Sequence, residues 1–175
     1  MCATVAPACS ASWAVKEVIE EAGGRPMMSR VGHAFIKSQM REHDAVFAGE
    51  LSGHYYFRDN YTAESSAMAV LAIANILSHG DTPLSARIAP LRKYAQSGEI
   101  NSRVSRDPQA ILQAIRERYA DGTLTELDGI SIAYKDWWFN VRCSNTEPLV
   151  RLNLEARTAE LMTTKRDEIL ACIRA

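Results

Sequence analysis

The sequence lacks cysteines spaced for a metal site or a disulfide framework. Its four cysteines, Cys2, Cys9, Cys143 and Cys172, form no C-x-x-C pair and are widely separated. Four free thiols are typical of a reducing compartment, so we expect a cytoplasmic protein. We predict no metal ligands in this chain.

The sequence also lacks a charge excess and a long apolar run. Its 175 residues carry a net charge of -1, without the clustered basic excess typical of nucleic-acid-binding proteins. The apolar run from Ala67 to Leu77 is too short to cross a bilayer, and we predict a buried helix there. No basic region precedes the apolar N-terminus, which argues against a signal peptide. We expect neither nucleic acid nor membrane as a partner.

The first part of the chain alternates helix and strand patterns. With 47% hydrophobic residues, the chain can bury a core without metal or disulfide support. The residue patterns predict helices over 13–22, 33–42 and 62–80 and strands over 25–31 and 44–50. Ser12 is the predicted cap of the first helix, and Thr62 is that of the third. This order indicates an α/β unit of three layers with a mixed, largely parallel sheet.

The second part of the chain has a different pattern. A join containing two prolines is predicted over 82–97, which leaves units at 1–90 and 98–175. After it we predict strands over 99–105 and 149–157, two strands within 129–142, and helices over 107–122 and 158–175. Asp107 caps the first of these helices, with Pro108 at its first position. This order indicates an α+β unit with an antiparallel sheet and two helices.

A polar loop from Arg142 to Pro148 lies between two predicted strands. Its arginine offers a planar fork that matches phosphate oxygens, and its Ser and Thr hydroxyls can donate further hydrogen bonds. Successive backbone N–H groups in such a turn can also form an anion-binding nest. The pattern indicates a phosphate site. The alternative is a polar hairpin with an ion pair between Arg151 and either Glu147 or Glu155.

A second polar stretch, Gly49 to Asp59, follows a predicted buried strand. Ligands of α/β sheets bind beyond the carboxyl ends of strands. Glu50, Ser52 and His54 alternate here, and a carboxylate beside a hydroxyl suits a ligand with neighbouring hydroxyl groups. The alternative is an ordinary turn or cap. A third polar turn, Arg30 to His33, follows a predicted strand, and a Gly-His pair there is more often a helix start than a site.

Three motifs together resemble the α-D-phosphohexomutase family, in its bacterial phosphomannomutase/phosphoglucomutase branch. They are VGHAFIK, GELSGHYYFRDN and VRCSNTEPLVRLNLEA, in the family's order. The resemblance runs from about Trp13 to the C-terminus. It implies most of the third domain and all of the fourth, TBP-like domain of an enzyme whose four domains surround one cleft.

The resemblance also implies roles for residues of the first unit. Glu50 and Ser52 would hold the O3 and O4 hydroxyls of the sugar, with His54 in the same loop. Gly32 and His33 would line the cleft beside them.

In the second unit, the resemblance implies a loop that grips the substrate phosphate. That loop would use Arg142, Ser144, Asn145 and Thr146, with Arg151 as nearby support. Cys143 occupies a position that varies in the family, so it is given no role.

The sequence departs from the family in lacking the phosphoserine loop and the D-G-D-x-D-R loop that binds Mg²⁺. The nearest strings, at Asp121 and Asp128, have no carboxylate triplet. We therefore expect a non-catalytic C-terminal part of a mutase: an expressed piece, a mis-assigned gene start or one half of a split gene. Its partners would be the enzyme's N-terminal domains and a mannose or glucose phosphate, and self-association through an incomplete third domain is a further expectation.

The intact enzyme would interconvert hexose 1-phosphate and hexose 6-phosphate through phosphoserine, with Mg²⁺ and a hexose 1,6-bisphosphate intermediate. Two alternatives stay open. The chain could be a stand-alone phosphosugar-binding module, or it could come from a phosphoglucosamine or phosphoacetylglucosamine mutase. The S-N-T-E-P form of the loop favours the mannose/glucose branch.

Overall fold

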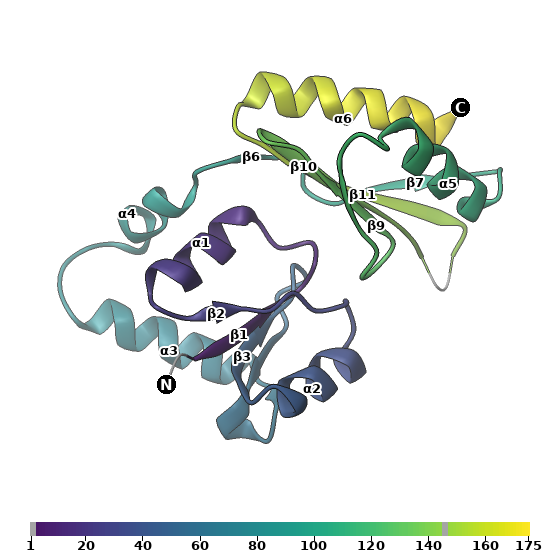
Figure 1. The fold of residues 1–175 in the computed structure, drawn as a ribbon. Coiled ribbons are helices and arrows are strands. Elements are labelled where there is room, and N and C mark those ends of the chain that lie inside the picture. Colours follow the sequence, from purple (N-terminus) through teal and green to yellow (C-terminus); the bar gives the residue numbers. More distant parts are fainter. Residues whose placement is uncertain (1–2, 145–146) are drawn as a thin grey trace. The chain divides into compact units, whose positions relative to one another are not determined.

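The computed structural model describes residues 3–144 and 147–175, and the chain divides into two compact units, Met1–Lys93 and Tyr94–Ala175 (Figure 1). The first unit contains a five-stranded sheet in the order β2-β1-β3-β4-β5. β1 pairs in parallel with β2 and β3, whereas the β3–β4 and β4–β5 pairs are antiparallel, so the predicted mixed sheet is confirmed. Its strands are β1 (Thr4–Pro7), β2 (Arg25–Pro26), β3 (Ala45–Gly49), β4 (Tyr55–Phe57) and β5 (Ala63–Glu64).

Helices α1 (Trp13–Glu21) and α2 (His33–Glu42) lie on opposite faces of this sheet (Figure 1). They connect β1 to β2 and β2 to β3, and two right-handed crossovers in opposite directions place their helices on opposite faces. The predicted cap is confirmed, because the Ser12 side chain accepts the Ala14 N–H at 3.1 Å. Small buried side chains on β1 and β3 leave room for Ile36 and Met40 of α2.

The longest helix of this unit, α3 (Ser66–Ser78), corrects two predictions. Thr62 does not cap it; the Ser65 hydroxyl accepts the Met68 N–H at 3.2 Å instead. None of its residues is buried, and Val70 is 64% exposed, so the prediction of a buried helix is wrong for this structure. An apolar helix is buried only where another surface packs against it. Whether such a surface is present depends on the tertiary structure and cannot be read from the helix sequence. No helix within residues 3–144 and 147–175 combines the length and apolar character needed to cross a membrane.

The rest of the first unit is built from short helical segments. They are η1 (Arg58–Asn60), α4 (Leu84–Ile88) and η2 (Ala89–Leu91). The last two lie within the stretch predicted as a join, which therefore contains helical turns.

The second unit is an antiparallel sheet covered on one face by α5 (Pro108–Arg118) and α6 (Ala159–Arg174) (Figure 1). The strand order is β6-β11-β10-β9-β8, and β7 also pairs with β11. The predicted α+β arrangement is confirmed. The strands are β6 (Ala95–Gln96), β7 (Ile100–Arg103), β8 (Thr123–Thr125), β9 (Ile130–Ala133), β10 (Trp137–Cys143) and β11 (Leu149–Ala156).

The core of the second unit follows from period-2 alternation on the two long strands. Phe139 and Val141 of β10 face the same layer as Leu152 of β11, and all three are fully buried. Ile115 of α5 and Ile169 of α6 pack into this layer from the helices. The rigid β10–β11 pair carries the polar loop at its end.

Candidate functional site

The first candidate site is the loop that joins β3 to β4. The loop closes on itself, since the Glu50 N–H donates to the His54 carbonyl and the Gly53 N–H donates to the Glu50 carbonyl, both at 3.0 Å. Gly53 has a φ of 83°, a conformation that residues with a Cβ rarely adopt. The predicted residues Glu50, Ser52 and His54 are therefore held on one tight turn.

The Glu50 carboxylate is the centre of this site, and the residue is only 8% exposed. Its Oε1 accepts the Gly32 N–H at 2.9 Å. Its Oε2 accepts the Tyr56 hydroxyl at 3.0 Å and lies 3.4 Å from His54 Nδ1. A carboxylate offers about four lone-pair positions. Two accept hydrogen bonds within the protein and a third faces His54, which leaves about one for a ligand.

His33, the first residue of α2, is oriented by Tyr56. Its Nδ1 lies 2.7 Å from the Tyr56 hydroxyl. That hydroxyl donates its one proton to Glu50, so its oxygen must accept from His33. His33 therefore carries its proton on Nδ1, and its Nε2 keeps a free lone pair.

Tyr56 links the two sides of the site and is fully buried. Burial raises the pKa of Tyr56, and the hydrogen bond to Glu50 and the nearby carboxylate charges raise it further. The hydroxyl consequently stays protonated and remains a donor to Glu50 at any ordinary pH.

The predicted residues of the first unit thus come together. Ser52 is exposed, and its Oγ lies 2.7 Å from His54 Nδ1. The rings of His33 and His54 have their centroids 5.0 Å apart. Gly32 donates its backbone N–H to Glu50. Its φ of 125° belongs to the turn that leads into α2 beside this carboxylate.

The second candidate site lies at the end of the β10–β11 pair. Arg142 and Arg151 are directly opposite each other in the sheet register. Two cations in such positions repel each other. Here the Glu99 carboxylate neutralises them in part, with contacts of 2.9 Å to Arg142 Nη2 and 3.4 Å to Arg151 Nη1. The alternative interpretation was an ion pair between Arg151 and Glu147 or Glu155. In the structure, Glu99 is the carboxylate that pairs with Arg151.

The two arginines have N–H groups without a hydrogen-bond partner among the described residues. Asp128 lies 3.9 Å from Arg142 Nη1, too far for a hydrogen bond. The buried Nε groups of Arg142 and Arg151 have no hydrogen-bond partner among the described residues. Buried donors are usually satisfied, so this pair of side chains suits an added anion.

The backbone around Arg142 is tightly constrained. Gly129 has a φ of 67°, and a Cβ there would lie 2.7 Å from the Arg142 Cα. The loop after β10 is closed by the Ser144 N–H, which donates to the Leu149 carbonyl at 2.9 Å. Asn145 and Thr146, also predicted as phosphate contacts, lie outside the described residues.

Sequence reasoning missed Tyr56 and Glu99, which organise these sites, and Glu64, which is paired with Tyr56 in the sheet register beside the first site. Tyr56 continues the alternation of Glu50, Ser52 and His54 by one step, so period-2 reasoning could have found it. Glu64 and Glu99 reach their sites only through tertiary structure, and no local pattern marks them.

Comparison with known families now identifies both units. The family model described as "Phosphoglucomutase/phosphomannomutase, alpha/beta/alpha domain III" matches residues 2–94, and the model described as "Phosphoglucomutase/phosphomannomutase, C-terminal domain" matches residues 99–171. The chain belongs to the phosphoglucomutase/phosphomannomutase family. The resemblance stated from the three motifs is therefore confirmed.

Individual relatives agree with this assignment. A phosphomannomutase from Methanocaldococcus jannaschii is 49% identical over 155 residues, which cover 89% of this chain and 34% of that protein. A phosphoglucomutase/phosphomannomutase family protein from Burkholderia thailandensis is 27% identical with a TM-score of 0.82, covering 98% of this chain and 37% of that one. The chain therefore spans about a third of the length of the relatives it matches.

More distant phosphohexomutases share the fold. Two structures of Aspergillus fumigatus N-acetylphosphoglucosamine mutase, one with glucose 1,6-bisphosphate and one with GlcNAc-6P and magnesium, have TM-scores of 0.68 and 0.65 at 15% identity. Each match covers 98% of this chain, and the matches cover 38% and 41% of the two mutase chains, respectively. At this identity the likeness concerns the fold alone.

The magnesium expected in this family does not fit the residues described here. The sequence has no D-G-D-x-D-R string. Among the described residues, the one set of three side chains gathered as metal ligands is His33, His54 and Glu64. Mg²⁺ prefers oxygen ligands, and two of these three ligands are imidazoles.

Proposed function

We propose that this chain supplies substrate binding to a phosphohexomutase that interconverts hexose 1-phosphate and hexose 6-phosphate. The second unit binds the substrate phosphate, and the first unit binds sugar hydroxyls. The sugar is mannose or glucose, in keeping with the phosphomannomutase relatives. The phosphoryl transfer itself, through phosphoserine and a hexose 1,6-bisphosphate with Mg²⁺, belongs to loops that this sequence does not contain.

The observation that carries the proposal is the facing pair Arg142 and Arg151 at the mouth of the polar loop. Two guanidinium groups provide planar donor forks for phosphate oxygens. Their repulsion is offset in part by one carboxylate, Glu99, with which a phosphate competes. Ser144 lies two residues after Arg142 and adds a hydroxyl. Asn145 and Thr146 complete the proposed loop.

The sugar-binding role of the first unit rests on the Glu50 turn. Glu50 keeps about one lone-pair position for a sugar hydroxyl, and the exposed Ser52 hydroxyl lies two residues further on the same turn. We assign O3 and O4 of the ring to these two side chains. His54, His33 and Gly32 orient the turn and line its surroundings.

The experiment is a titration with inorganic phosphate, followed by the amide NMR shifts of the whole 175-residue chain. We expect a dissociation constant in the millimolar range, which corresponds to about -4 kcal/mol. The shifts should centre on Arg142 and Ser144. Arg142→Lys should weaken binding, because an ammonium cannot match two oxygens at once.

The matched control is Arg116→Lys, which alters an arginine of the same unit that pairs with Glu126 at 3.0 Å. This control should leave phosphate binding unchanged. Shifts that persist undiminished in Arg142→Ala would show that the polar loop does not bind the phosphate.

A further inference from the structure

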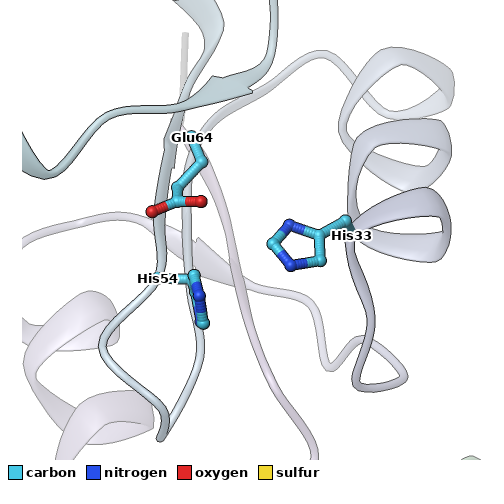
Figure 2. A group of neighbouring side chains, drawn as sticks. All are labelled: His33, His54 and Glu64. Atoms are coloured by element: carbon cyan, nitrogen blue, oxygen red, sulfur yellow. The ribbon is translucent and has the colours of Figure 1, made fainter.

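Three potential metal ligands from separate elements gather beside the Glu50 turn (Figure 2). His33 begins α2, His54 ends the turn, and Glu64 lies on β5. One ligand atom of each lies within 4.8 Å of the others. His33 is exposed, and His54 and Glu64 are half-buried, so an ion from solution can reach all three.

The sheet register explains why these side chains share one face. His54 and Tyr56 are two residues apart, so both point to the same side of the strand. Tyr56 is paired in register with Glu64, and cross-strand partners also share a face. His33 reaches this face from α2 through its contact with the Tyr56 hydroxyl.

The contacts of both imidazoles are compatible with metal binding through Nε2. The hydrogen-bond order through Tyr56 places the His33 proton on Nδ1. His54 Nδ1 lies 2.7 Å from Ser52 Oγ and 3.4 Å from the acceptor-only Glu50 carboxylate, which favours a proton on that nitrogen too. With the protons on Nδ1, each Nε2 offers a lone pair to an ion.

The surroundings of the two histidines resemble the outer shell of metal centres. A ligating histidine almost always donates its other N–H to a carboxylate, a backbone carbonyl or water, which fixes the ring; here the Tyr56 hydroxyl takes that place for His33. Here His33 donates to Tyr56, and Tyr56 donates to the buried Glu50. The same Glu50 carboxylate lies beside His54 Nδ1.

We propose that His33, His54 and Glu64 form a binding site for a divalent transition-metal ion of the Zn²⁺ class. Two imidazoles and one carboxylate suit Zn²⁺ or Co²⁺ and disfavour Mg²⁺. Ligand bonds of about 2.0–2.2 Å in a tetrahedral site place the ligand atoms about 3.4 Å apart. The three side chains must close in from their present positions. Glu64, whose Oε1 accepts only a long 3.4 Å hydrogen bond from Ser66 among the described contacts, and the loop residue His54 can do so. Water or a solute takes the fourth position.

The proposed metal site overlaps the proposed sugar contacts, because His33 and His54 belong to both. Glu64 belongs to the metal site alone. If the sugar-binding proposal is also right, the metal and the sugar compete for the Glu50 turn. Titration with the metal ion alone tests the metal site independently of sugar binding.

The test is a Co²⁺ titration of the whole reduced chain, followed by the visible absorption that tetrahedral Co²⁺ develops on binding. We expect one saturable equivalent. His54→Ala and Glu64→Gln should each weaken binding at least about tenfold, as should His33→Ala. Tyr56→Phe, which removes the hydroxyl that orients His33, should weaken binding by about 10- to 100-fold in a folded chain.

The control is His43→Ala, which removes an exposed histidine of the same unit, paired only with Glu42 at 3.9 Å among its charged contacts in the described chain. Its Co²⁺ affinity should equal that of the unmodified chain. The proposal fails if the chain shows no saturable Co²⁺ band, or if His54→Ala and Glu64→Gln bind as the control does. A thiolate charge-transfer band would also overturn it, because the ion would then be bound by cysteine.

Discussion

Replacing Glu99 by Gln should tighten phosphate binding, because Glu99 holds the two arginines that we assign to the phosphate. Its carboxylate oxygens lie 2.9 Å from Arg142 Nη2 and 3.4 Å from Arg151 Nη1. Phosphate must therefore compete with a fixed negative charge. The amide of Gln keeps one acceptor oxygen for orienting a guanidinium but removes that charge.

The size of the effect follows from Coulomb's law. Two unit charges about 7 Å apart, at an effective dielectric constant of about 40–80 for a partly exposed site, repel by about 0.6–1.2 kcal/mol. Removing this repulsion corresponds to binding about 3- to 8-fold tighter. The gain should shrink at high salt, where screening weakens the repulsion.

The assay is the phosphate titration by amide NMR shifts at low and at high salt. Glu126→Gln is the matched control, since it also removes one acidic charge paired with an arginine of the second unit, Arg116, at 3.0 Å. Its phosphate affinity should stay within the error of the unmodified chain. Weaker binding in Glu99→Gln, with the control unchanged, would show that Glu99 supports the phosphate site by positioning and does not compete for it.

Three further outcomes are expected. The 175-residue chain alone should show no mutase turnover of mannose 1-phosphate or glucose 1-phosphate in a coupled assay with Mg²⁺ and a bisphosphate activator; turnover that survives repurification would contradict this. Limited proteolysis followed by mass spectrometry should cut first within residues 82–97, whereas first cuts inside β11 would argue against separate units. Gly129→Ala should destabilise the second unit by about 2 kcal/mol or more in urea unfolding, because its Cβ meets the Arg142 backbone at a positive φ, and an unchanged midpoint would refute this reasoning.

Local signals in the sequence predicted most helices well. The predicted range 33–42 matches α2, and the Asp107 side chain caps α5 by accepting the Gln109 N–H at 3.1 Å, with Pro108 at the first helical position. These features depend on a few neighbouring residues. They can therefore be read without knowledge of the tertiary structure.

Short strands and burial were harder to predict. β1, β6 and β8 have four residues or fewer and were not predicted, because so few residues show no clear pattern and pairing with other strands defines them. In β11, Asn153 and Glu155 alternate with apolar residues, as on the polar face of a half-buried strand, yet both are buried. Glu155 is stabilised there by hydrogen bonds from Trp138 Nε1 at 3.3 Å and Gln96 Nε2 at 2.9 Å.

The candidate sites divide in the same way. Residues within one motif, such as Glu50 and His54, could be named from the sequence. Their partners Glu64 and Glu99 could not, since each is brought to its site by a strand pairing or an ion pair between distant segments.

The most direct test of the assigned roles compares two ligands, inorganic phosphate and mannose 1-phosphate, by amide NMR shifts of the whole chain. Phosphate should shift the amides of Arg142 and Ser144 and leave the Gly49 to His54 turn unmoved. Mannose 1-phosphate should shift the Arg142 loop and that turn, and Glu50→Gln should abolish only the second effect. If mannose 1-phosphate leaves both regions unmoved while the chain is folded, the assignment of sugar and phosphate binding to these residues is contradicted.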